Sequence, residues 1–143
     1  MRFFAIILCI GMLALAGCEE PQAQKLVDCT TNSLDFPMTV QYSPPYQFLI
    51  GISQSPTGHL SFHGEIVLQQ STGVVARIAF SSQDIISCNW LPGVDGYILT
   101  WSRTNHGERL SDLLVRKQTY DVHVAFDDPP PVKSSLWLSS MKR

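Results

Sequence analysis

The sequence predicts an all-β protein: an antiparallel β-sandwich of about seven to eight strands that follows a cleaved N-terminal signal. Three observations lead to this prediction. Apolar residues alternate with polar ones in several short segments, as in strands that bury one face. Turn-forming residues separate these segments, about every 8–12 residues. The chain of 143 residues also lacks a segment with a convincing helical period. A small β-barrel is the alternative architecture.

The first 17 residues have the pattern of an export signal. Arg2 supplies a short positive segment, and the apolar run 3–15 is shorter than the roughly 20 residues that a membrane-spanning helix needs. Leu15-Ala16-Gly17-Cys18 follows and resembles the lipobox of bacterial lipoproteins. An ordinary secretory signal with a chance cysteine is the alternative.

The lipobox resemblance implies a processed, lipid-anchored chain. It implies cleavage before Cys18, a diacylglycerol on the Cys18 sulfur and acylation of the new amino group. Two or three acyl chains anchor a protein stably, whereas a single chain binds a membrane only marginally. Glu19, where an Asp would favour the inner membrane, implies the outer membrane of a Gram-negative bacterium, with the protein facing the periplasm.

Processing also changes the cysteine count. Cys9 is removed with the signal and Cys18 carries lipid, so Cys29 and Cys88 remain. Because the periplasm is oxidising, we expect these two to form a disulfide. Two buried thiols or a shared metal ion are the alternatives.

Composition limits the function classes. The formal net charge is −2 and 15% of the residues are charged, which excludes a strongly basic nucleic-acid-binding protein. Hydrophobic residues make up 45% of the chain, which excludes a disordered protein.

The chain after the signal divides into a tether and one domain. Residues 18–35 comprise Cys18 and a polar stretch without a sustained period, which predicts a tether. Residues 36–143 form the single sandwich domain. Within it we expect strands at 36–42, 46–52, 74–80, 97–103, 120–126 and 134–140. Residues 60–70 are ambiguous between strand and helix, and 83–91 favours a loop or short helix that carries Cys88.

Residues 114–126 resemble the corner of immunoglobulin-like sandwiches. Leu114 is followed by a short polar turn and then by Tyr120, at the start of an alternating strand. In such corners a Tyr hydroxyl bonds the backbone of the turn between two strands. The resemblance implies an immunoglobulin-like sandwich, although Lys117-Gln118 stands where such corners often carry Pro-Gly.

The sequence lacks the motifs of common catalytic sites. It has no Gly-x-Ser-x-Gly elbow, no glycine-rich phosphate loop and no Cys-x-x-Cys, so we expect neither an enzyme nor a cofactor. His59 and His63 lie four residues apart, which on a strand separates them by about 13 Å. That is too far to share one metal ion, so we expect no metal site. His123 alternates with apolar residues and is expected to point outward.

Three residues are candidates for partner binding. Trp90 precedes the turn formed by Pro92-Gly93, and an exposed Trp near a loop marks a binding hot spot. Asp127 and Asp128 precede three prolines and predict a rigid acidic loop that could steer a basic partner. The alternatives are a core position for Trp90 and a solvated loop for the two aspartates.

A looser resemblance covers residues 36–140. It is carried by Tyr-x-Phe at 46–48, by Leu114 with the Tyr-x-Val-x-Val segment 120–124, and by Leu-Trp-Leu at 136–138. These features resemble small β-sandwich lipoproteins of Gram-negative bacteria. Some of those are immunity proteins that block effectors of type VI secretion, often phospholipases.

The resemblance implies a lipid-anchored periplasmic protein that binds an effector toxin. A structural or assembly lipoprotein of the envelope or of a secretion apparatus, bound to an envelope component, is the alternative. A small enzyme or ligand carrier is a third hypothesis. None of the three involves nucleic acid.

Overall fold

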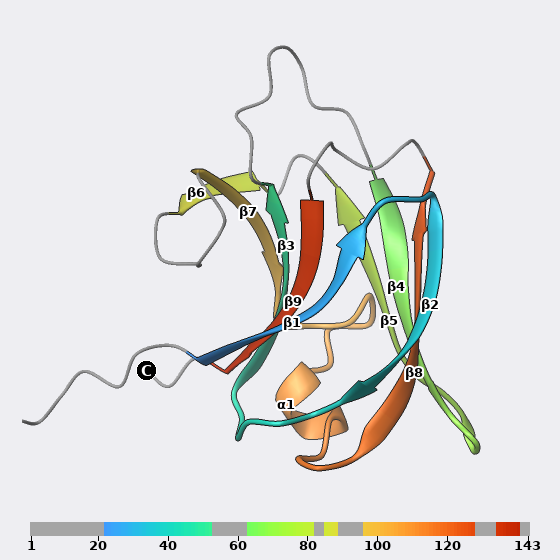
Figure 1. The fold of residues 1–143 in the computed structure, drawn as a ribbon. Helices are drawn as coiled ribbons and strands as arrows, with labels where there is room; N and C mark the ends of the chain where they lie inside the picture. The colour runs from blue at the N-terminus through green and yellow to red at the C-terminus, as the bar shows by residue number, and fades with distance from the viewer. Residues whose placement is uncertain (1–21, 53–62, 82–84, 89–95, 128–133, 141–143) are drawn as a thin grey trace, which may run out of the picture.

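Two antiparallel sheets pack face to face in the computed structural model, which describes residues 22–52, 63–81, 85–88, 96–127 and 134–140 (Figure 1). The predicted antiparallel β-sandwich is confirmed. The first sheet has the order β1 (Gln22–Cys29), β9 (Ser134–Ser140), β3 (Tyr46–Ile52), β7 (Gly96–Trp101) and β6 (Ile85–Cys88). The second has the order β2 (Ser33–Thr39), β8 (Thr119–Phe126), β4 (His63–Gln70) and β5 (Gly73–Ser81).

The connectivity is that of a jelly roll with one additional edge strand, β6. Successive strands change sheets except in the pairs β4–β5 and β6–β7, which lie side by side. The order differs from the immunoglobulin sandwich, in which the first two strands share a sheet. The corner motif does not distinguish these two connectivities, because an alternating pattern identifies a strand but not the sheet that it joins.

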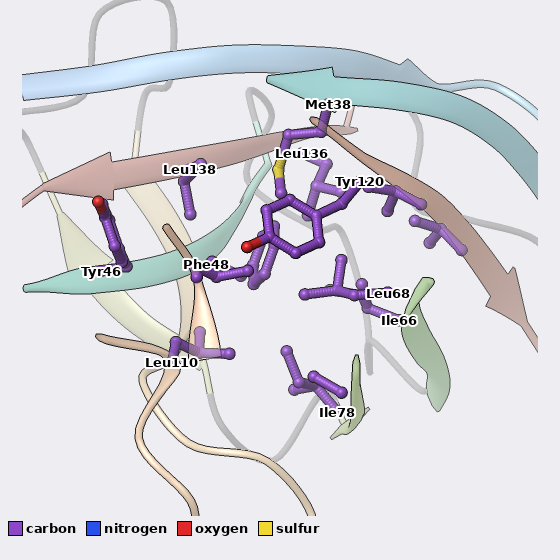
Figure 2. Close-up of a cluster of buried hydrophobic side chains, with 14 of the residues drawn as sticks. Met38, Tyr46, Phe48, Ile66, Leu68, Ile78, Leu110, Tyr120, Leu136 and Leu138 are labelled. Atoms are coloured by element: carbon purple, nitrogen blue, oxygen red, sulfur yellow. The ribbon is translucent and has the colours of Figure 1, made fainter. Parts of the chain in front are cut away.

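The core fills the space between the sheets (Figure 2). Alternate residues of β5 and β8 are buried, as a two-residue period requires. From the first sheet come Tyr46, Phe48, Leu136 and Leu138, and from the second Met38, Ile66, Leu68, Ile78 and Tyr120. The ring of Phe80 also packs against two other aromatic rings. Its centroid lies 5.5 Å from that of Trp101 and 5.2 Å from that of Phe126.

A single helical turn, α1 (Leu110–Leu113), closes one end of this core. Leu110 and Leu114 are buried, and the Ser111 hydroxyl accepts a hydrogen bond from the backbone N–H of Tyr46 at 3.0 Å. Four residues are too few to show a helical period, so the sequence pattern does not predict this turn.

The segment before α1 covers the outer edge of β5. The N–H of Asn105 donates to the carbonyl of Arg77 at 2.9 Å, and its side-chain oxygen accepts from the N–H of Ala79 at 2.6 Å. The hydroxyl of buried Thr104 accepts from the N–H groups of His106 and Glu108. Asn105 thus satisfies edge groups that would otherwise attract another strand.

The predicted tether is corrected for most of its length. Residues 22–29 form β1, which pairs with β9, and β2 begins at Ser33. A β-bulge between Lys25 and Val27 leaves Leu26 and Val27 both half-buried. The extra residue breaks the two-residue period on which strand prediction depends.

The described residues of the two ambiguous segments are also strands. The apolar run within 60–70 belongs to β4, and β6 occupies 85–88, where a loop or short helix was expected.

The strand directions define two ends of the sandwich. At the basal end β1, β3 and β8 begin and β9 finishes, so that Gln22 and Tyr46 both pair with Ser140. At the apical end β1, β3 and β8 finish and β4 begins with His63. A strand of eight residues spans about 26 Å, which is the separation between the two ends.

Candidate functional site

Asp127 lies at the apical end, directly after β8, and is exposed. Its backbone N–H donates to the carbonyl of His63 at 2.8 Å, and its Oδ2 lies 3.1 Å from His63 Nε2. The antiparallel register of β4 with β8 brings these two residues together. The side chains are 58% and 64% exposed, so the pair contributes little to stability and leaves the carboxylate open to a partner.

The other predicted partner-binding residues lie outside the described residues. Trp90 belongs to the segment between Cys88 and Gly96. Cys88, the last residue of β6, pairs with Gly96, the first residue of β7, at the apical end. Asp128 follows Asp127 directly. The described residues that flank all three candidates therefore share one end of the sandwich. Cys18 lies outside the described residues as well.

The outward face of the second sheet carries further charge pairs. His123 Nδ1 lies 2.7 Å from Asp35 Oδ1, across the β2–β8 pair. Arg77 Nη1 lies 3.0 Å from Glu65 Oε2, across the β4–β5 pair. The outward position predicted for His123 is confirmed.

Sequence reasoning missed the partners of His63 and His123. Each pair joins residues that are far apart in the chain, so only the strand register could have revealed it. A prediction of which strands pair would have been the required signal.

The expected disulfide is wrong, because Cys29 is a free, buried thiol. Cys29 is on β1 and Cys88 on β6, at opposite edges of one sheet. One row of the register runs through Cys29, Ser134, Ile52, Tyr97 and Ser87, the neighbour of Cys88. Four strand spacings separate the two edges by roughly 19 Å. Disulfides require Cα atoms within about 7 Å.

The environment of Cys29 makes its thiol inert. Burial raises the pKa of Cys29 from 9.0 to about 11; the Ser134 hydroxyl acts in the opposite direction, and the charge of Asp28 adds to the rise. Since the thiolate is the nucleophile and the metal ligand, a thiol that stays protonated at neutral pH suits a structural role.

Within the ranges described, no three His, Cys, Asp or Glu side chains gather in a way that could hold a metal ion. His59, considered with His63 as a possible ligand, lies outside those ranges. The described part of the chain also contains no helix with the length and apolar character of a membrane span.

Comparisons with known proteins give no relative for this chain. No protein family, no curated protein and no solved structure matches it.

Proposed function

We propose that the protein is a lipid-anchored periplasmic binding protein, an immunity protein that blocks an antibacterial secreted effector of the phospholipase type. One observation carries the proposal: the described chain enters the sandwich at one end, and Asp127, with the described residues that flank the other predicted binding residues, lies at the opposite end. β1 begins at Gln22, four residues after Cys18, beside Ser140. Asp127 lies at the opposite end, after β8.

This arrangement suits a protein that captures a partner above a membrane. The acyl chains on Cys18 would hold the basal end at the lipid surface, and the apical loops would face the periplasm. Loops on a rigid sandwich are a common place for recognition residues. An exposed carboxylate at Asp127 would speed the encounter with a basic partner.

The inhibition itself needs no chemistry from this chain. A rigid surface that covers the effector's active site is sufficient. The packed core, and the hydrogen bond that the backbone N–H of Val115 donates to the Tyr120 hydroxyl at 2.9 Å, support such rigidity.

Protection of living cells tests the proposal. The full-length chain would be produced in bacteria that receive, in the periplasm, the phospholipase effector encoded beside its gene. We expect survival with the wild-type chain and reduced survival with Asp127→Lys. Asp121→Lys is the matched control, because Asp121 is an exposed aspartate near the basal end of β8, the strand that Asp127 follows.

Two results would contradict the proposal. The first is cell death in spite of normal amounts of the wild-type chain. The second is constitutive co-purification with an envelope complex when no toxin gene is nearby, which would support the assembly lipoprotein instead.

A further inference from the structure

We propose that the basal end of the sandwich rests on an anionic lipid surface through Arg116, Lys117 and Val115. The basal surface is defined here by two segments, Gln41–Pro45 and Val115–Gln118. The inference deepens the lipid-anchoring part of the proposed function and rests on it.

The predicted lipid anchor is close in sequence to a strand that begins at the basal end. Gln22 is four positions after Cys18, a reach of at most about 14 Å in extended chain. Gln22 pairs with Ser140, and the Ser140 hydroxyl donates to the carbonyl of Ser43. The chain that follows the acylated residue therefore enters the fold beside the basal surface.

Hydrogen bonds fix the two basal segments to each other. The N–H of Lys117 donates to the carbonyl of Val40 at 2.8 Å, and Arg116 Nε donates to the carbonyl of Gln41 at 3.2 Å. The N–H of Gln118 closes a turn on Val115 at 3.1 Å. The side chains of this turn are thus presented from a fixed backbone.

The chemistry of the turn fits a lipid surface. Arg116 and Lys117 are adjacent, exposed cations in a protein of net charge −2, and the ion pairs between described residues use neither of them. Val115 is 56% exposed, one of two large hydrophobic side chains so exposed among the described residues. An exposed apolar side chain next to cations fits a surface that contacts anionic headgroups.

Tethering makes such a small contact sufficient. A weak site becomes intramolecular once the chain is anchored, so its effective concentration is high. The contact would orient the sandwich and direct Asp127 away from the membrane. Two acidic residues, Asp112 on α1 and the exposed Asp121 on β8, each lie three residues from this turn in sequence and would weaken the contact without removing it.

The test compares lysine labelling of the full mature lipoprotein on two kinds of vesicle. One contains phosphatidylethanolamine and phosphatidylglycerol, and the other only phosphatidylcholine. A water-soluble amine reagent is applied, and modified lysines are identified by mass spectrometry. We expect labelling of Lys117 to be at least about threefold slower on the anionic vesicles, and high salt to remove the difference because it screens charge. Lys25, which is paired with Asp28 at 2.7 Å on β1, is the internal reference.

Two matched variants make the result specific. Arg116→Gln should restore much of the labelling at Lys117, and Arg77→Gln, on the outward face of the second sheet, should not. Equal labelling of Lys117 on both vesicles overturns the basal contact but leaves the anchor intact. A chain that fails to float with either vesicle, as expected for Cys18→Ser, overturns both the anchor and the contact.

Discussion

The hydroxyl of Tyr120 accepts a hydrogen bond from the backbone N–H of Val115 at 2.9 Å and lies 3.4 Å from the carbonyl of Leu113, to which it donates. The side chain is only 2% exposed. It therefore ties the turn after α1 to the start of β8, as the corner motif in the sequence predicted. The turn that it holds also carries Arg116 and Lys117.

Tyr120→Phe should lower the free energy of unfolding by about 1–3 kcal/mol, because it leaves partly buried backbone groups without their partner. Urea unfolding at constant m-value would measure the loss. Tyr42→Phe is the control, because Tyr42 is half-buried. Its backbone carbonyl accepts a hydrogen bond from the Tyr46 hydroxyl at 2.9 Å, which the substitution keeps. An equal effect of both substitutions would show that the corner hydroxyl has no special role.

Lys117 adopts a left-handed backbone conformation, with φ of 68°, within the same turn. Such a conformation costs a side-chain-bearing residue about 1–2 kcal/mol, and glycine avoids this cost at some loss of chain entropy. We expect Lys117→Gly to raise the free energy of unfolding by up to about 1 kcal/mol and Lys117→Val to lower it by about 1–2 kcal/mol. Parallel urea titrations would give the order. A more stable valine variant would show that the turn relaxes to another conformation.

Gly64 on β4 allows this strand to pack closely against its two neighbours, β8 and β5. A Cβ at this position would lie 2.1 Å from the carbonyl oxygen of Ala125 and 2.6 Å from Cζ of Phe80. The carbonyl belongs to a paired strand and cannot move easily, so Gly64→Ala should cost about 3 kcal/mol, at the upper end of overpacking effects.

A double-mutant cycle with Phe80→Leu separates the two clashes in the Gly64 variant. Removing the ring should recover only part of the loss, because the clash with the Ala125 carbonyl remains. Thermal or urea unfolding of the four proteins gives the coupling. Full recovery in the double variant would mean that the backbone contact is unimportant.

The sequence pattern predicts most of the strands but not the order in which they pair. The segment 46–52 alternates cleanly and was found as β3 with the predicted bounds. The sequence pattern predicts a tether where β1 forms, because the bulge of β1 interrupts the alternation. Strand order depends on long-range pairing, which a local pattern does not contain.

The same distinction applies to the candidate site. The sequence predicts Asp127 on a surface loop, and it is exposed directly after the last residue of β8. Its contact with His63 and the separation of Cys29 from Cys88 both follow from strand register. Counting cysteines in an oxidising compartment therefore gave a pairing that the fold does not allow.

The buried thiol of Cys29 makes stability depend on alkaline pH. The folded pKa is about 11, whereas the ordinary value is 9.0, so below pH 9 the thiol is protonated in both states and contributes nothing to the pH dependence. Between these two values the unfolded chain loses the proton and the folded chain keeps it. The unfolded state then binds fewer protons, and stability falls as pH rises.

Cys29→Ala removes this titration. We expect the wild-type chain to lose about 2 kcal/mol more than the variant between about pH 8 and pH 10.5, because a difference of one pKa unit corresponds to about 1.4 kcal/mol. Urea unfolding of both proteins at the two pH values gives this difference. Contributions of lysines and tyrosines are common to both proteins and cancel in the comparison. Parallel curves for the two proteins would mean that the Cys29 thiol is accessible to water. In that case it should also react with a thiol reagent in the folded protein, which a side chain with 4% exposure should resist until the chain unfolds.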